Sequence, residues 1–375
     1  MQDELMLSLF SFIFMIILIA CQVVSLYVSR KDIYLGIRIP QDERKSSEVK
    51  AIGKSYVRAN FIIGVPTAII LSYLVYKFMY TFVYTASIFV FIFIDFIIYY
   101  FYNRKMAELK REKGWLKTKK QIVVIDTSFS KLNGEKIISG SKWFAISIIF
   151  IIVCIIINIK QYPSLPKVYP THWAMNGKPN GYTYKSYMSI FSVPIQQVVL
   201  TVIMFISYKM IVWSKREIDA KNPEESKNKN IKCRNIWIMY TVLVTFVMQI
   251  IFMIEDFQVM QIVKVNTVFI TIFVLAISFG IGIVSIIIAI KVGQGGSRLK
   301  EKPSDKNFET NVRDDDKYWK LGNTIYYNKN DPSIFIEKRF GIGWTVNAGT
   351  KIGMLFYIAT VAIIIVAIAM SIFEK

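Results

Sequence analysis

Eight long apolar segments constrain this chain more than any other feature of its sequence. None of them contains a charged residue, and segment 59–76 leads through Lys77 into its neighbour. A helix that crosses a membrane needs about 20 consecutive, mostly apolar residues, within a range of about 17–25. The segments therefore predict eight membrane-spanning helices, near residues 5–28, 59–76, 78–94, 143–159, 186–208, 235–254, 265–290 and 352–373.

Two of these segments need further argument. Residues 59–103 carry only two charges, on Lys77 and Asp95, and are too long for one helix, so we expect a hairpin of two helices that turns near residues 77–80. The first segment follows Asp3 and Glu4 rather than a basic region. It is therefore predicted to be a true span and not a signal peptide.

The basic residues give the predicted helices an orientation. With the N-terminus outside, the inside segments 29–58, 103–142, 214–235 and 291–351 hold 38 of the 46 Lys and Arg residues. This split follows the positive-inside rule and leaves both chain ends outside. The net charge of +20 is then explained by orientation and by an anionic inner leaflet of the lipid bilayer, with no direct binding of nucleic acid.

Composition excludes several kinds of site. Hydrophobic residues make up 54% of the chain and charged residues 19%, against about 45–50% and about 25% in soluble proteins. His172 is the single histidine, and the predicted outside acids are few: Asp3, Glu4, Glu255, Asp256 and Glu374. Three scattered cysteines make no disulfide framework. We expect no metal, no cofactor and no catalytic residue.

The segments between the helices divide the chain further. Residues 121–126 are predicted to form a strand, and residues 214–235 a solvated linker. The first predicted segment (1–60) is the first helix with a basic stretch that contains Gly36-Ile-Arg-Ile-Pro40, and the second (61–142) is a helical hairpin with an inside segment. Two helices around an outer loop (143–213) and helices six and seven (214–290) follow. The chain then continues as a flexible linker (291–312), a cytoplasmic β-rich module (313–350) and helix eight (351–375).

The β-rich module is predicted from two short β-prone runs. Residues 324–327 and 333–339 flank Asn328-Lys-Asn-Asp-Pro332, which predicts a β-hairpin, and residues 340–347 supply a third strand. We expect the module to dock on the inner membrane face, with Trp319 and Trp344 at the interface. Its candidate functional residues are Tyr318, Trp319, Gly322, Tyr327, Asn328, Asp331, Pro332, Glu337, Arg339, Gly341, Gly343, Trp344 and Asn347.

The predicted outer loop, 160–188, is dense in residues that favour turns. Four prolines lie between Pro163 and Pro179, so we expect rigid turns without regular structure. Asn180-Gly181 favours a turn with positive φ. His172 is a candidate for ligand recognition, although a structural turn residue is the simpler interpretation.

The outer loop resembles a bacterial family. Pro170-Thr-His-Trp-Ala-Met-Asn-Gly-Lys-Pro-Asn-Gly181 is similar to the signature of the membrane domain found in the Sdp toxin immunity protein. The residues that match are Pro170, His172, Trp173, Gly177, Pro179, Asn180 and Gly181.

Two other segments extend this resemblance. Residues 317–347 resemble a second uncharacterised module that is often joined to the first in Firmicutes, and residues 36–40 resemble a Gly-Ile-Arg-Thr-Pro element of the immunity proteins. In those proteins the element follows the histidine loop instead of preceding it. The resemblance implies a bacterial cytoplasmic membrane protein that meets a toxin peptide outside and a small transcriptional regulator inside.

Polar residues inside the predicted helices suggest an alternative function. Asp95 is costly in a membrane unless it is paired, and Lys209 at similar depth is its predicted partner. Gln196, Gln197 and Gln249 are expected to form hydrogen bonds between helices. The preferred function is thus a non-enzymatic sensor or immunity-type protein. The alternatives are a transporter that uses Asp95 and the glutamines and, more remotely, a lipid-modifying enzyme.

The predicted topology is open to a direct test. A cysteine placed at Gly177 should lie outside, and cysteines placed at Asn230 and Asn328 should lie inside, because the basic residues are concentrated in the segments that hold positions 230 and 328. The measurement is labelling of intact cells with a membrane-impermeant thiol reagent. Labelling of positions 177 and 328 from the same side would contradict eight spans.

Overall fold

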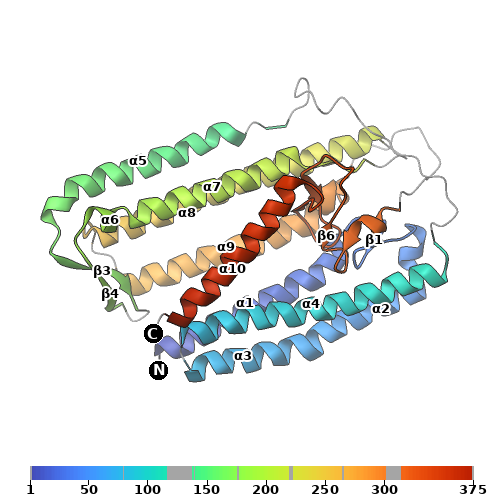
Figure 1. Cartoon of the computed structure of the whole chain (residues 1–375), viewed down its shortest axis with the longest axis horizontal. Coiled ribbons are helices and arrows are strands. Elements are labelled where there is room, and N and C mark those ends of the chain that lie inside the picture. The colour runs from blue at the N-terminus through green and yellow to red at the C-terminus, as the bar shows by residue number, and fades with distance from the viewer. Residues whose placement is uncertain are drawn as a thin grey trace. The chain divides into compact units, whose positions relative to one another are not determined.

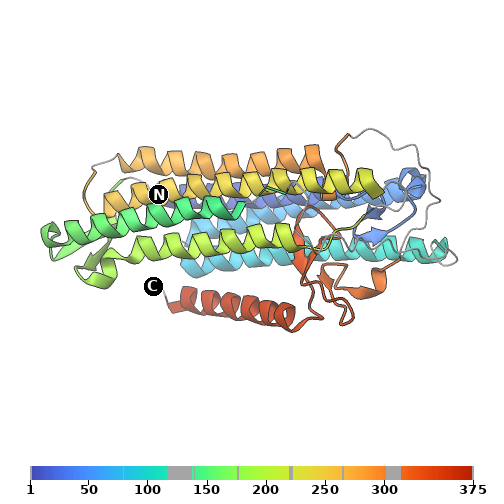
Figure 2. The same cartoon turned by 90° about the horizontal axis from the view of Figure 1, so that it is seen from above.

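The computed structural model describes residues 2–78, 80–115, 137–138, 140–174, 177–218, 223–263, 266–300 and 314–373. The predicted strand at 121–126 lies outside these residues. The chain divides into two compact units. Figures 1 and 2 show its helices and strands. Unit 1 comprises residues 1–3, 136–212 and 234–285, and unit 2 comprises residues 4–135, 213–233 and 286–375.

Eight helices in the described residues are long and apolar enough to cross a membrane, as the sequence predicts. They lie within Glu4–Val28, Ser47–Phe78, Thr81–Glu112, Gly140–Ser164, Ser192–Trp213, Glu224–Val259, Val268–Gly296 and Lys351–Met370. Apolar side chains remain uncovered along them; Ile363 of the last helix, for example, is 69% exposed. Such surfaces need a hydrocarbon environment. The chain is a mostly helical, multi-pass membrane protein.

Unit 2 is built on helices α1 (Gln2–Val28), α2 (Ser47–Ala59), α3 (Val65–Phe78), α4 (Thr81–Glu112) and α10 (Lys351–Phe373). The Ser46 side chain caps α2 by accepting a hydrogen bond from the Val49 amide. A π-helical turn, Asn60–Gly64, joins α2 to α3 in one helical run. The turn between Phe78 and Thr81 confirms the predicted helical hairpin.

Short strand pairs lie at one end of the unit 2 helices (Figure 1). Strands β1 (Ile33–Tyr34) and β2 (Ile37–Arg38) pair around a turn in which Leu35 and Gly36 have φ of 48° and 79°. In the C-terminal module, β5 (Trp319–Lys320) pairs with β6 (Ile325–Tyr326), and β7 (Phe335–Glu337) with β8 (Trp344–Val346).

The predicted hairpin between residues 324–327 and 333–339 is therefore wrong, although the predicted third strand forms. Tyr326 instead bridges Asn347 in parallel, and the Ala348 amide donates to the Tyr326 carbonyl at 2.9 Å. The reason lies in the intervening residues, because Asn328 and Asp331 bind Asn347 and do not close a turn between strands.

Unit 1 contains α5 (Phe144–Gln161), strands β3 (Val168–Trp173) and β4 (Pro179–Tyr184), α6 (Tyr187–Ile190) and α7 (Ser192–Trp213). Helix α8 (Pro223–Val259) and helix α9 (Thr267–Val292) contribute one part to each unit. The strands and α6 lie beyond the ends of α5 and α7 (Figures 1 and 2). A capping box between Ser186 and Ser189 starts α6.

Two predicted linkers contain folded residues. Within the linker at 214–235, α8 already begins at Pro223. Within the linker at 291–312, residues 294–296 form a 3-10 turn in which Gln294 is only 2% exposed. A Cβ atom on Gly296 would lie 2.4 Å from the Lys229 carbonyl oxygen, so this turn packs closely on α8 within unit 2.

The turn at Gly36 generates a stability prediction with a matched control. Gly36→Ala and Gly114→Ala both place a side chain at positive φ, which costs about 1–2 kcal/mol. Only at Gly36 would the new Cβ crowd a neighbour, at 2.4 Å from the Tyr99 hydroxyl; at Gly114 the space is open. Thermal unfolding in detergent should show a clearly larger loss for Gly36→Ala. Equal losses would show that the turn is not packed against α4.

Candidate functional site

The predicted outer loop is an antiparallel hairpin and not a set of irregular turns. Val168 pairs with Tyr184 and His172 with Gly181, with register shifts on both sides of His172. The positive φ predicted for Asn180-Gly181 belongs instead to Gly177, whose φ is 82°. Gly181 is needed for a different reason, because a Cβ atom there would lie 2.8 Å from the Cβ of His172.

His172 remains at the surface of the hairpin. Its Nδ1 lies 2.5 Å from the Oδ1 of Asn180 in the facing strand. Because an amide oxygen only accepts, this contact holds the proton on Nδ1. The ring is thus tied to the hairpin on one side, which agrees with a structural role, while its exposed position leaves it available to a ligand. Pro170, Trp173 and Pro179 lie in the same two strands.

The hairpin has one anchored side and one exposed aromatic side. Tyr169 is fully buried among Leu165, Ile190 and neighbouring apolar residues, and its hydroxyl lies 2.9 Å from the Ser189 hydroxyl oxygen. Exposed fractions of 61–80% are found for the large side chains Tyr182, Tyr184, Tyr187 and Met188. Residues 160–188 contain four lysines and no Asp or Glu. The free surface is therefore aromatic and basic.

Buried polar side chains link the helices of unit 1. The Asn158 amide of α5 donates to the Asp256 carboxylate of α8 at 2.9 Å, and the Gln249 amide of α8 donates to the Thr201 hydroxyl of α7 at 2.8 Å. Gln249 therefore joins two helices, as predicted. Asp256, which the sequence analysis places among the outside acids, lies near the end of α8 and is completely buried.

The buried glutamine of α7 is Gln197 and not Gln196. Gln196 is exposed on the helix surface, whereas Gln197 is fully buried with its Nε2 at 3.7 Å from the sulfur of Cys154. The side-chain oxygens of Gln197 and Gln249 accept no hydrogen bond from the described residues. The interior of unit 1 thus carries unsatisfied acceptors, which are costly in an apolar environment.

The two predicted intramembrane charges have partners of their own. Asp95 of α4 accepts a hydrogen bond from the Gln22 amide at 2.6 Å, and Gln22 in turn accepts from the Tyr56 hydroxyl at 3.0 Å. The Lys209 ammonium lies 5.1 Å from the centre of the Phe205 ring. Because Asp95 belongs to unit 2 and Lys209 to unit 1, their predicted pairing stays a prediction.

Unit 2 contains a buried ion network that is centred on Arg38. Its guanidinium lies 2.7 Å from the Asp32 carboxylate, 3.0 Å from Glu217 and 3.1 Å from Asp315. Arg38 is only 6% exposed. The Gly36-Ile-Arg-Ile-Pro40 element and the C-terminal module, which the sequence analysis treated separately, therefore meet at this side chain.

The acidic run at the start of the module holds two further cations. Arg339, 1% exposed, forms ion pairs with Asp315 and Asp316 and packs on the Trp319 ring at 5.3 Å. The Lys110 ammonium of α4 lies 2.6 Å from the Asp316 carboxylate. The network thus joins all four segments that the sequence analysis assigned to one side of the membrane.

The network is held in its charged form. Burial would raise the pKa of Glu217, but the charges of Arg38 and Arg30 hold it well below its usual range. The same guanidiniums lower the pKa of Asp32 against the effect of burial. These carboxylates are therefore ionised at neutral pH, and each balances a guanidinium that would otherwise be buried without a counter-charge.

Asn347 fixes the module to α10. Its side-chain oxygen accepts from the Asn328 and Gly349 amides at 3.1 and 2.9 Å, and its Nδ2 donates to the Asn328 and Asp331 carbonyls at 3.0 and 2.9 Å. Asp331 also pairs with the Lys215 ammonium at 2.5 Å, and this contact lowers its pKa against the effect of burial. A buried asparagine with its bonding capacity filled in this way is a structural clasp.

The remaining module candidates are mostly structural. Trp319 is 5% exposed and packs on Tyr326, so its predicted place at the membrane interface is wrong. The indole is instead buried between Tyr326 and the Arg339 guanidinium inside the module. Tyr318 packs on Tyr326, the Tyr327 amide donates to the Tyr318 carbonyl, and Glu337 is buried near Arg30. Positive φ is found at Gly322, Gly341 and Gly343, Trp344 is half-buried, and Pro332 is exposed.

Sequence reasoning missed the acidic half of the network. Asp32 and Glu217 carry no motif, and Glu217 lies in a segment interpreted as a solvated linker. The run Asp314-Asp-Asp316 was visible only as the start of the module. Among the described residues, no group of three or more His, Cys, Asp or Glu side chains is arranged to hold a metal ion.

Two family models match parts of the chain. Residues 148–198 match a domain of unknown function (DUF1648), which spans most of α5, the β3–β4 hairpin and the start of α7. Residues 329–354 match a family of unknown function (DUF5808), which spans Asp331, β7, β8 and the start of α10. No curated protein and no solved structure matches the chain. The matches identify two uncharacterised modules without a link to immunity proteins.

Proposed function

We propose that this chain is a non-enzymatic receptor of the immunity or signal-sensing type in a bacterial cytoplasmic membrane. In this proposal the β3–β4 hairpin faces outward and binds a peptide, toxin or envelope signal. The end of unit 2 that carries the ion network faces the cytoplasm and meets a partner such as a transcriptional regulator. The orientation rests on the distribution of basic residues.

The observation that carries this proposal is the aromatic and basic surface of the hairpin. Tyr184 is 80% exposed beside Tyr182, while Tyr169 anchors the opposite side in the core. Exposed aromatic patches on a rigid support favour recognition of a partner. With four lysines and no acid in residues 160–188, the surface suits a peptide that carries apolar and acidic side chains.

A second function, ion- or proton-coupled transport, is favoured by the interior of unit 1. Asp256 and Gln249 are buried in one apolar helix, and their neighbours Asn158 and Gln197 are equally buried. Intramembrane acids of this kind mark ion pathways in many transporters. The receptor is preferred because each of these side chains also has a structural explanation as a contact between helices.

Site-specific photo-crosslinking distinguishes these functions. A photoreactive residue at Tyr184 should form an adduct with a secreted peptide that carries apolar and acidic side chains when intact cells are exposed to it. The same residue at Tyr73, 58% exposed on α3, is the control and should label only lipid. Adducts with lipid alone at both positions would mean that the tyrosines form an interfacial aromatic belt, and the receptor proposal would fail.

A further inference from the structure

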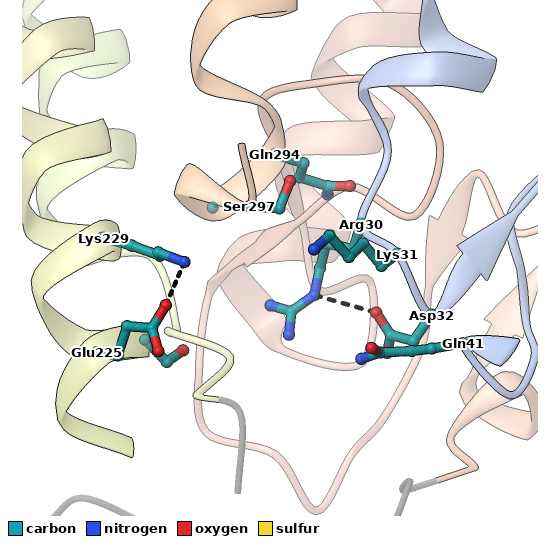
Figure 3. A pocket seen from close by; sticks show the side chains of 10 residues that line it. Arg30, Lys31, Asp32, Gln41, Glu225, Lys229, Gln294 and Ser297 are labelled. Atoms are coloured by element: carbon teal, nitrogen blue, oxygen red, sulfur yellow. Dashed lines mark hydrogen bonds and ion pairs between the residues drawn. The ribbon is translucent and has the colours of Figure 1, made fainter. Parts of the chain in front are cut away.

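A polar cavity of about 260 Å³ opens within unit 2, where α1 ends, α8 begins and α9 ends (Figure 3). Its walls come from residues 30–32, from the first turns of α8 and from the glycine-rich turn after α9. This volume is somewhat below the range of about 300–1,000 Å³ typical of pockets for drug-sized ligands. The cavity therefore suits a small polar group.

Three basic side chains line the cavity, and they differ in how closely acidic side chains approach them. The Lys229 ammonium is bound to the Glu225 carboxylate at 2.5 Å. The Arg30 guanidinium lies 3.5 Å from Asp32, 3.6 Å from Glu217 and 3.8 Å from Glu337, and it donates to the Glu217 backbone carbonyl at 3.2 Å. Lys31 is exposed and has no ion-pair partner among the described residues. Figure 3 shows Lys229 and Arg30 on opposite walls, so an anion between them would contact both.

Gln294 adds a buried acceptor to this wall. It is 2% exposed, and its Nε2 donates to the Lys338 carbonyl oxygen. Its Oε1 accepts no hydrogen bond within the part of the chain that the structure describes. An unsatisfied buried amide oxygen is unfavourable unless a ligand or water supplies a donor. The Gln294 oxygen lies behind the wall without accessible surface, so the cavity itself offers the cations of Arg30, Lys31 and Lys229 for an anionic group and the carboxylates of Asp32 and Glu225 for a hydroxyl.

The wall that carries Gln294 is rigid. Gly293, Gly295 and Gly296 have φ of 68°, 58° and 81°, and Gly296 leaves no room for a Cβ atom against the Lys229 backbone. The Arg298 guanidinium donates to the Tyr27 carbonyl of α1 at 3.0 Å. These contacts hold the turn between α8 and α1, so the cavity does not depend on a ligand to form it.

We propose that this cavity binds a phosphoglycerol group. Its phosphate would lie among Lys31, Arg30 and Lys229, and its hydroxyls would donate to the carboxylates of Asp32 and Glu225. A choline headgroup has no hydroxyl or N–H to donate to these two carboxylates.

Two sources supply this chemistry, the headgroup of phosphatidylglycerol and free glycerol phosphate. The cavity lies at the ends of three apolar spans, the depth at which lipid headgroups are found. This position favours the lipid. The proposal is independent of what the hairpin of unit 1 binds.

Native mass spectrometry of the full-length protein in detergent tests the proposal. Phosphatidylglycerol should bind more tightly than phosphatidylcholine of the same chain length. Lys31→Gln should weaken phosphatidylglycerol binding about fivefold, the effect of one basic residue near a phosphate. Lys54→Gln, on an exposed lysine of α2, is the matched control and should leave binding unchanged.

The outcomes separate the two sources. Competition by glycerol phosphate, or its binding in place of the lipid, would support the phosphoglycerol site with a soluble ligand. Equal binding of the two lipids without any binding of glycerol phosphate would overturn the proposal. Equal effects of Lys31→Gln and Lys54→Gln on phosphatidylglycerol binding would also overturn the proposal. Because Lys31 is exposed and unpaired among the described residues, its replacement should not disturb folding, and circular dichroism checks this.

Discussion

The buried guanidinium of Arg38 is the interaction on which the arrangement of unit 2 depends. A charge that is 6% exposed is tolerated only when opposite charges surround it, and Asp32, Glu217 and Asp315 do so at 2.7–3.1 Å. These carboxylates come from segments that are far apart in the sequence. The need to neutralise one buried cation therefore brings the first, third and fourth basic segments together. Lys110 and Asp316 add the second.

The rest of unit 2 supports this centre by close packing. Tyr99 of α4 stacks on Phe340 of the module with ring centres 4.5 Å apart, and its hydroxyl donates to the Gly322 carbonyl at 2.6 Å. Gly36 lies against the same hydroxyl. Small, sharply turned residues thus allow the module and the β1–β2 turn to approach α4. Asn347, just before the start of α10, holds the Asn328–Asp331 segment in place by hydrogen bonds.

The sequence predicts the helices well because their signal is local. A run without charges of the length of residues 352–373 has few alternatives to a membrane helix, and the turn near residues 77–80 follows from length alone. Strand pairing was harder, because Tyr326 meets Asn347 through a clasp of asparagine side chains and not through a turn motif. The burial of Asp256 depends on its contact with Asn158 of α5, about a hundred residues away in the sequence, and such a contact leaves no local signal.

The candidate sites also divide into residues with a local sequence signal and residues that only long-range contacts bring together. His172 and Gly181 were found because they lie close together in sequence, although the reason for the glycine is contact with His172 and not positive φ. Arg38 and Asp315 lie in separate motifs, and only the fold shows that they form one site. Long-range ion pairs leave no periodic pattern in a single sequence. The acidic half of the network could therefore not be predicted.

A double-mutant cycle on Arg38→Gln and Asp315→Asn tests the central claim most directly. The free energy of unfolding of the wild type, both single variants and the double variant gives the coupling between the two side chains. If Arg38 and Asp315 stabilise unit 2 as a buried pair, we expect a coupling of about 1–3 kcal/mol between them. The exposed pair Lys113–Glu48, whose side chains are 42% and 48% accessible, should give a clearly smaller coupling, because solvent screens exposed charges. A coupling between Arg38 and Asp315 no larger than that of the exposed pair would contradict the account.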